Sequence, residues 1–118
     1  MMYNYYGKEY ELNFKKSKYY ENGRLAIQVV SRELNEEWFE PFCMLTVNLP
    51  DVILSSDGSK EMPDNMAFLD VNNCPPTLVD KIVKEGLVTM TRTIATSGFC
   101  AYPLVRFDED WLNSLPTL

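Results

Sequence analysis

The tetrapeptide Glu21-Asn22-Gly23-Arg24 constrains the fold of this chain more tightly than any other local feature of the sequence. Asn and Gly readily adopt the positive φ angles of a type I′ turn, and β-forming residues flank the pair on both sides. We therefore predict a hairpin in which residues 18–21 pair antiparallel with residues 24–32. Since so short a connection can join only antiparallel strands, we expect an antiparallel sheet.

Alternating apolar and polar residues predict further strands. Tyr10, Leu12 and Phe14 alternate with polar neighbours, and this period of two places the apolar groups on one face. Strands are also predicted before the turn at Gly7 and at residues 38–48, 66–72, 87–96 and 99–107. Because Pro41 cannot donate to a strand ladder, we expect an edge position or a bulge there. The N-terminal half is thus predicted to be a meander, and residues 57–63 a surface loop.

One short helix is predicted near residues 77–86. Its apolar stripe at helical spacing consists of Leu78, Val79, Ile82 and Val83. Thr77 is the expected N-cap, and Gly86 is placed to end the helix in the left-handed conformation. Asp108 is expected to cap a C-terminal helical turn that ends before Pro116.

These elements predict an α+β fold in a single domain spanning residues 1–118. We expect an antiparallel sheet of about five to seven strands, with the short helix packed against one face. The 46% hydrophobic and 24% charged residues fit a folded globular chain and not a disordered one.

The residue types present exclude several kinds of catalytic site. The chain contains no histidine, so Ser–His and Cys–His catalysis and His-ligated metals are ruled out. Its three cysteines, Cys43, Cys74 and Cys100, are too widely spaced for a zinc site, and no phosphate-binding glycine motif is present. Cys100 follows a glycine turn, yet its apolar neighbours predict a buried structural thiol, as they do for Cys43. We expect no catalytic residue, no cofactor and no metal.

The charge and the termini bear on partners and location. A net charge of −6, from 17 acidic against 11 basic residues, disfavours direct binding of nucleic acid. No signal peptide and no apolar stretch long enough to cross a membrane can be identified. Three cysteines cannot all pair within one chain, which favours a reducing compartment. We therefore expect a cytoplasmic location and no membrane contact.

Two features could carry binding. The first is a group of tyrosines around the first hairpins, and the candidate interaction surface is Tyr3, Tyr5, Tyr6, Tyr19 and Tyr20. Tyrosine on a sheet face is more often half-buried structure, but exposed tyrosine is enriched in protein interfaces. The second is acidic: Glu33, Glu36, Glu37, Glu40 and residues 108–110. Such groups are usually a solvated surface, although on a rigid sheet they can imitate a phosphate backbone.

The chain resembles a family of small uncharacterised proteins encoded in gut Firmicutes and in their conjugative or phage-like mobile elements. The resemblance rests on YYGKEYEL at residues 5–12, NGRLAIQ at 22–28, LTVNLP at 45–50, AFLDVNN at 67–73 and SGFCAYPL at 97–104. It implies a bacterial mobile-element context and no assigned activity.

Our leading hypothesis is a non-enzymatic protein-binding accessory factor of a mobile element, with a protein partner. The alternative is an acidic DNA mimic or anti-defence inhibitor. A third hypothesis, a small enzyme using carboxylate with Lys or Tyr chemistry, requires a concave pocket with convergent polar groups. An exposed apolar edge strand would favour a homodimer.

Overall fold

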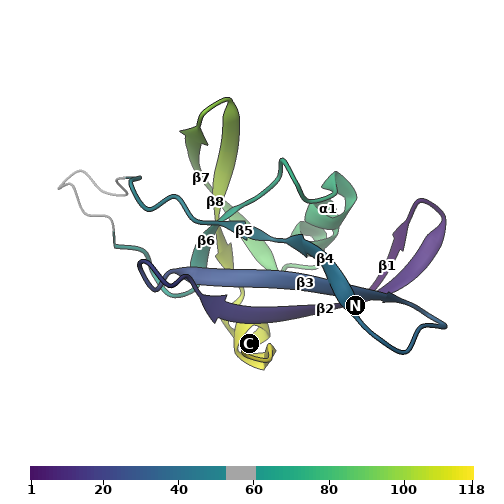
Figure 1. Cartoon of the computed structure of the whole chain (residues 1–118). Coiled ribbons are helices and arrows are strands. Elements are labelled where there is room, and N and C mark those ends of the chain that lie inside the picture. Colours follow the sequence, from purple (N-terminus) through teal and green to yellow (C-terminus); the bar gives the residue numbers. More distant parts are fainter. Residues whose placement is uncertain (53–60) are drawn as a thin grey trace.

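Two four-stranded antiparallel sheets account for most of the chain (Figure 1). The computed structural model describes residues 1–52 and 61–118. The predicted α+β class is confirmed, but the strands are divided between two sheets, where the sequence predicted one sheet of five to seven strands. Most of the loop predicted at residues 57–63 lies outside the described residues.

The first sheet is the predicted meander. Its strands lie in chain order: β1 (Met2–Tyr5), β2 (Lys8–Lys18), β3 (Leu25–Glu33) and β4 (Glu40–Met44). The predicted β2–β3 hairpin is confirmed, with Lys18 opposite Leu25. Pro41 lies on the edge strand β4, next to a bulge in the β3–β4 register, as its missing donor predicted.

The type I′ turn expected at Asn22-Gly23 is instead found at Tyr6-Gly7. Tyr6 has φ 51° and Gly7 has φ 80°, and the flanking residues Tyr5 and Lys8 are directly paired. In the β2–β3 loop, only Gly23 of the Asn-Gly pair has a positive φ, and its N–H donates to the Tyr19 carbonyl at 2.8 Å. That prediction was wrong because the connection is longer than two residues.

The second sheet begins where the chain leaves β4. Its strand order is β5 (Thr46–Val47), β6 (Met66–Leu69), β8 (Cys100–Phe107) and β7 (Val88–Ser97). Leu45, between β4 and β5, donates its N–H to the Ile27 carbonyl at 2.9 Å and accepts from the Asp70 N–H at 2.9 Å. One extended segment therefore belongs to both sheets and holds them together.

The helix α1 (Pro76–Lys84) closes the core. It buries Leu78, Val79 and Ile82. The predicted end at Gly86 is confirmed by its φ of 74°. Thr77 does not cap the helix: Pro75 occupies the N-cap position, and the Thr77 Oγ1 is hydrogen-bonded to the Tyr3 hydroxyl at 2.5 Å. Pro76 at the first helical position has no N–H, so this helix start has one fewer donor that needs a partner.

A second short helix, α2 (Glu109–Ser114), brings the C-terminus to the first sheet. The Asp108 carboxylate accepts from the Trp111 N–H at 3.0 Å, which confirms the predicted cap. Beyond it, the Leu118 N–H donates to the Lys16 carbonyl at 2.9 Å. The C-terminal segment thus lies beside Lys16 on the same edge of β2 that β1 pairs with at residues 8–11. No helix among the described residues is long and apolar enough to cross a membrane.

We predict that Ile82→Ala lowers the free energy of unfolding by about 2–5 kcal/mol, because it leaves a cavity in the core. Ile82 is fully buried, whereas its helical neighbour Val83 is exposed. The matched substitution Val83→Ala should change the free energy by at most about 0.5 kcal/mol. Equilibrium urea denaturation measures both values, and equal losses would contradict the packing of α1 described above.

Candidate interaction surface

The five candidate tyrosines do not form one surface. Tyr3, Tyr5 and Tyr6 belong to β1 and the turn after it, whereas Tyr19 and Tyr20 follow the far end of β2. Because β2 has 11 residues and a strand rises about 3.3 Å per residue, the two groups lie on the order of 30 Å apart.

Two of the five tyrosines are structural. Tyr3 is only 4% exposed, and its ring stacks on Tyr5 at 5.9 Å and meets Phe42 edge-on at 6.1 Å. Tyr19 is half-buried and its hydroxyl is hydrogen-bonded to the Thr46 Oγ1 at 2.9 Å. Burial raises the pKa of Tyr19, so its phenol stays neutral at physiological pH.

Tyr6 has the opposite character. It is 90% exposed, yet it occupies a left-handed backbone conformation with φ 51°. For residues other than Gly, Asn and Asp, this conformation is disfavoured by about 1–2 kcal/mol. Its ring lies 4.5 Å from the Tyr5 ring, edge to face. Apart from this contact, most of the Tyr6 side chain is open to solvent.

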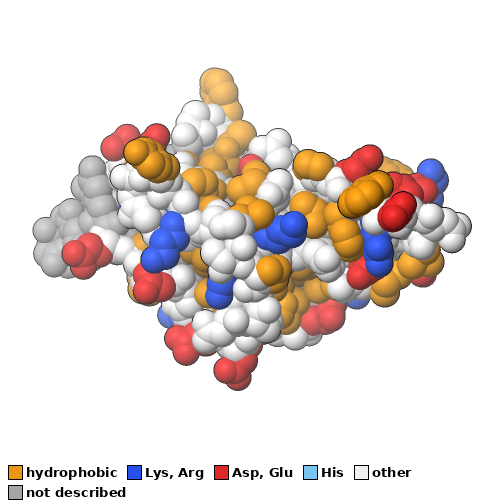
Figure 2. Space-filling view, turned by 60° about the horizontal axis from the view of Figure 1, so that its bottom comes forward, with side chains coloured by type: hydrophobic (Ala, Val, Ile, Leu, Met, Phe, Trp, Pro, Cys, Tyr) orange, Lys and Arg blue, Asp and Glu red, His pale blue; other side chains and the backbone are white. Residues whose placement is uncertain are grey.

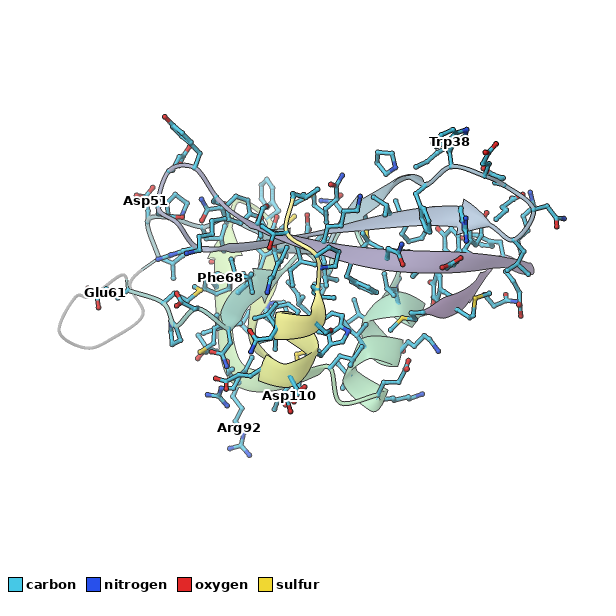
Figure 3. All side chains as sticks on the ribbon, turned by 90° about the horizontal axis from the view of Figure 1, so that it is seen from below. Trp38, Asp51, Glu61, Phe68, Arg92 and Asp110 are labelled. Carbon is cyan, nitrogen blue, oxygen red and sulfur yellow. The ribbon has the colours of Figure 1, made fainter. Side chains whose placement is uncertain are left out.

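The loop between β3 and β4 lies at the same end of the first sheet as the β1–β2 turn (Figure 1). It adds further exposed apolar groups. Trp38 is 74% exposed and Leu34 is 59% exposed. Trp38 lies at the outer edge of the molecule in Figure 3. We call this region the aromatic end, and it consists of Tyr5, Tyr6, Leu34, Trp38 and Phe42. The sequence predicts the tyrosines of the aromatic end as candidate binding residues. It does not predict Leu34, which it places in a turn, or Trp38, which it places in a strand.

Acidic residues surround the aromatic end. Lys8 pairs with Glu33 at 3.2 Å, and this hydrogen bond raises the pKa of the Lys8 ammonium. Arg32 pairs with Glu11 at 2.7 Å. The exposed residues of the β3–β4 connection add further carboxylates, at Glu36, Glu37 and Glu40. In Figure 2, acidic, basic and hydrophobic side chains are intermixed at this end.

A second protrusion is the β7–β8 hairpin, which extends from the body at the top of Figure 1. Its two-residue turn is Gly98-Phe99, with Gly98 at φ 61° and Phe99 fully exposed. The sequence predicts Phe99 to be the first residue of a strand. On β7, Ile94 is exposed beyond a bulge that contains Arg92 at φ 74°. We call this hairpin the arm.

The cysteines depart from the sequence expectation in one respect. Cys43 and Cys100 are half-buried where both were expected to be buried, and only Cys74 is fully enclosed. The Cys43 and Cys74 sulfur atoms lie 3.1 Å apart. Within residues 1–52 and 61–118, no group of three or more acidic or thiol side chains is arranged to hold a metal ion.

One of the hollows in the surface lies between β2 and α2. Its volume is about 230 Å³, below the ~300–1,000 Å³ of typical ligand sites. Lys16, Lys18 and Asp64 line it. The Lys16 ammonium already donates to the Leu112 carbonyl at 2.9 Å. This hollow is therefore smaller than a typical ligand site, and one of the two lysines that line it already has a partner.

We predict that Tyr6→Asn does not destabilise the fold by more than about 0.5 kcal/mol, because Asn accepts the left-handed conformation. The lost contact with the Tyr5 ring offsets part of the gain. Equilibrium urea denaturation of both proteins measures the difference. A loss above about 1 kcal/mol would show that Tyr6 has a structural role.

Comparison with known proteins identifies the family. A model described as Domain of unknown function (DUF4313) matches residues 13–117. No curated protein matches the chain, and no solved structure does. The matched segment runs from the middle of β2 to the end of the C-terminal segment on the edge of the first sheet. The chain therefore belongs to the DUF4313 family, a domain of unknown function.

Proposed function

We propose that this protein is a non-enzymatic, cytoplasmic protein-binding accessory factor of a bacterial mobile element, and that the aromatic end is its binding surface. The observation that carries the proposal is Tyr6, a 90% exposed aromatic residue held in a conformation that disfavours it. Disfavoured backbone conformations that persist in a fold concentrate at functional positions.

The tyrosines of the aromatic end are held in place by contacts within the protein. The Tyr5 ring contacts Tyr6 at 4.5 Å and Phe42 at 5.6 Å, both edge to face. The two-residue turn fixes the backbone under Tyr6. A surface that is already ordered loses less conformational entropy on association. Tyrosine and tryptophan also dominate the energetic centres of protein interfaces, which supports a binding role for Tyr6 and Trp38.

The charges around the aromatic end favour a particular kind of partner. Glu36, Glu37 and Glu40 are exposed beside Trp38, while the nearby bases Lys8 and Arg32 are already paired with Glu33 and Glu11. The rim is therefore acidic. A complementary partner presents apolar surface to Tyr6 and to Trp38, with lysine or arginine around it.

The same acidic rim supports the alternative, an acidic DNA mimic or anti-defence inhibitor. Such a protein would bind a DNA-handling enzyme mainly through its carboxylates. Exposed charge pairs are screened by salt, with a Debye length of about 10 Å at 0.1 M and about 3 Å at 1 M. A contact centred on Tyr6 and Trp38 should survive high salt, whereas a contact centred on the carboxylates should not.

We predict that the double variant Tyr6→Ala/Trp38→Ala loses its protein partner. The loss of one interface residue that contributes about 2 kcal/mol weakens the affinity ~30-fold. The loss of both residues should therefore weaken it at least that much. The matched control is Tyr20→Ala, because Tyr20 is equally exposed but lies at the opposite end of β2. The measurement is affinity capture from nuclease-treated lysate of a Firmicute that carries mobile elements, washed at low and high salt and quantified by mass spectrometry.

The proposal is supported by a stoichiometric partner that resists high salt, is retained by the Tyr20 variant and is lost by the double variant. A DNA-handling enzyme that high salt removes from all three proteins would support the mimic instead. Equal capture by the double variant at high salt would exclude the aromatic end. Phe99→Ala, tested in parallel, would then show whether the arm is the contact surface.

A further inference from the structure

Cys43 and Cys74 form a pair of facing thiols that the binding surface does not use. Cys43 lies on the edge strand β4, and Cys74 lies in the turn between β6 and α1. Their sulfur atoms are 3.1 Å apart, although 31 positions separate the two residues in the sequence. The Cys74 thiol is also 3.1 Å from the Met44 carbonyl. Two elements distant in sequence are thus joined by a sulfur–sulfur contact.

The turn that carries Cys74 is fixed by backbone hydrogen bonds. The Asp70 carbonyl accepts from the Cys74 N–H at 2.9 Å and from the Asn73 N–H at 3.2 Å. The Asn73 amide in turn donates to one Asp70 carboxylate oxygen at 2.9 Å. Because Asp70 also donates its N–H to Leu45, the turn is anchored to the segment that follows β4. The position of Cys74 opposite Cys43 is therefore set by the backbone of both sheets.

The two thiols are not equivalent. Cys43 is half-buried and open to a small reagent, whereas Cys74 is only 4% exposed. The Cys74 S–H donates to the Cys43 sulfur, which lowers the pKa of Cys43 against the opposing effects of burial and of the Asp70 carboxylate. The same contact, burial and Asp70 raise the pKa of Cys74. Thiolate character and access together make Cys43 the first thiol to react.

We propose that Cys43 and Cys74 are an oxidation site that a hydroperoxide converts into an intramolecular disulfide. The proposal stands independently of protein binding at the aromatic end. It rests on the facing geometry of the two sulfur atoms, on the fixed turn beneath Cys74 and on the unequal exposure of the two residues.

The chemistry proceeds in two steps. The Cys43 thiolate attacks the terminal oxygen of the hydroperoxide, the O–O bond breaks, and the leaving oxygen takes up a proton as water or an alcohol. Cys43 is then a sulfenic acid. The Cys74 thiol gives up its proton and its sulfur attacks the Cys43 sulfur, the S–O bond breaks, and the hydroxyl leaves as water. With hydrogen peroxide, two thiols and one peroxide give one disulfide and two waters.

The two sulfur atoms need to move only a short way to form the bond. A disulfide bond is about 2.05 Å long, so the sulfur atoms must approach by about 1 Å from their separation of 3.1 Å. The bond would tie the edge strand β4 to the start of α1. A cross-link across a loop of this length stabilises a fold by restricting its unfolded state. A thiol reductant would return both cysteines to the free form.

The test uses the reduced full-length protein treated with a small excess of hydrogen peroxide, quenched, denatured and alkylated. We expect peptide mass spectrometry to find one product, a Cys43–Cys74 cross-link with the loss of two hydrogen atoms. The unfolding temperature should rise by roughly 5–15 °C and fall back after reduction. The control Cys100→Ser, which removes the other half-buried thiol, should behave like the parent protein.

The variant Cys74→Ala should stop at the Cys43 sulfenic acid, which dimedone traps. Cys43→Ala should form neither product. Unfolding transitions recorded on the reduced variants establish that each one is folded before treatment. Oxidation of Cys100 at the same rate as Cys43, or conversion of Cys43 to the sulfinic acid in the parent protein with no cross-link, would overturn the proposal.

Discussion

The passage of the chain from one sheet to the other at Leu45 is the constraint on which the rest of the structure depends. Leu45 is fully buried, and its backbone bonds to Ile27 of the first sheet and to Asp70 beside the second. The next residue repeats the pattern, since the Thr46 hydroxyl oxygen accepts from the Ile27 N–H at 3.1 Å. Because these groups are buried, breaking one of the bonds would leave an unsatisfied polar atom in the core. These hydrogen bonds therefore join the two sheets at the crossing.

Both candidate sites derive their positions from this crossing. Phe42 and Cys43 lie on β4, just before Leu45. Phe42 supports the rings of Tyr3 and Tyr5, and through Tyr5 it supports Tyr6. Cys43 meets Cys74, whose turn begins at the residue that bonds to Leu45. An edge strand is paired with a neighbouring strand on one side only. Here the hydrogen bonds of Leu45 hold the end of β4 and so set the positions of Phe42 and Cys43.

The sequence predicted the features that depend on neighbouring residues. The end of α1 at Gly86 and the Asp108 cap follow from local chemistry, and both are present. The pairing of β2 with β3 is present too, although the connection is longer than the two-residue turn that Asn22-Gly23 predicted. The division into two sheets could not be predicted, because residues 38–48 have the pattern of a single strand and the change of partner at Leu45 depends on tertiary contacts. The tyrosines were grouped by sequence, but the length of β2 separates them. Trp38 and Phe99 were missed because exposure is a property of the folded chain.

Backbone strain and exposed apolar groups occur together in this protein. Gly7, Gly23, Gly86 and Gly98 supply positive φ angles at turns and at the end of α1, where they meet no steric penalty. Among the described residues, only Tyr6 and Arg92 adopt such angles with a side chain. Tyr6 lies in the aromatic end, and Arg92 lies in the bulge of the arm, near exposed Ile94. Since glycine meets the needs of chain reversal elsewhere, folding alone does not account for these two residues. This coincidence of strain with exposed apolar surface is the observation on which the proposed binding role of the aromatic end rests.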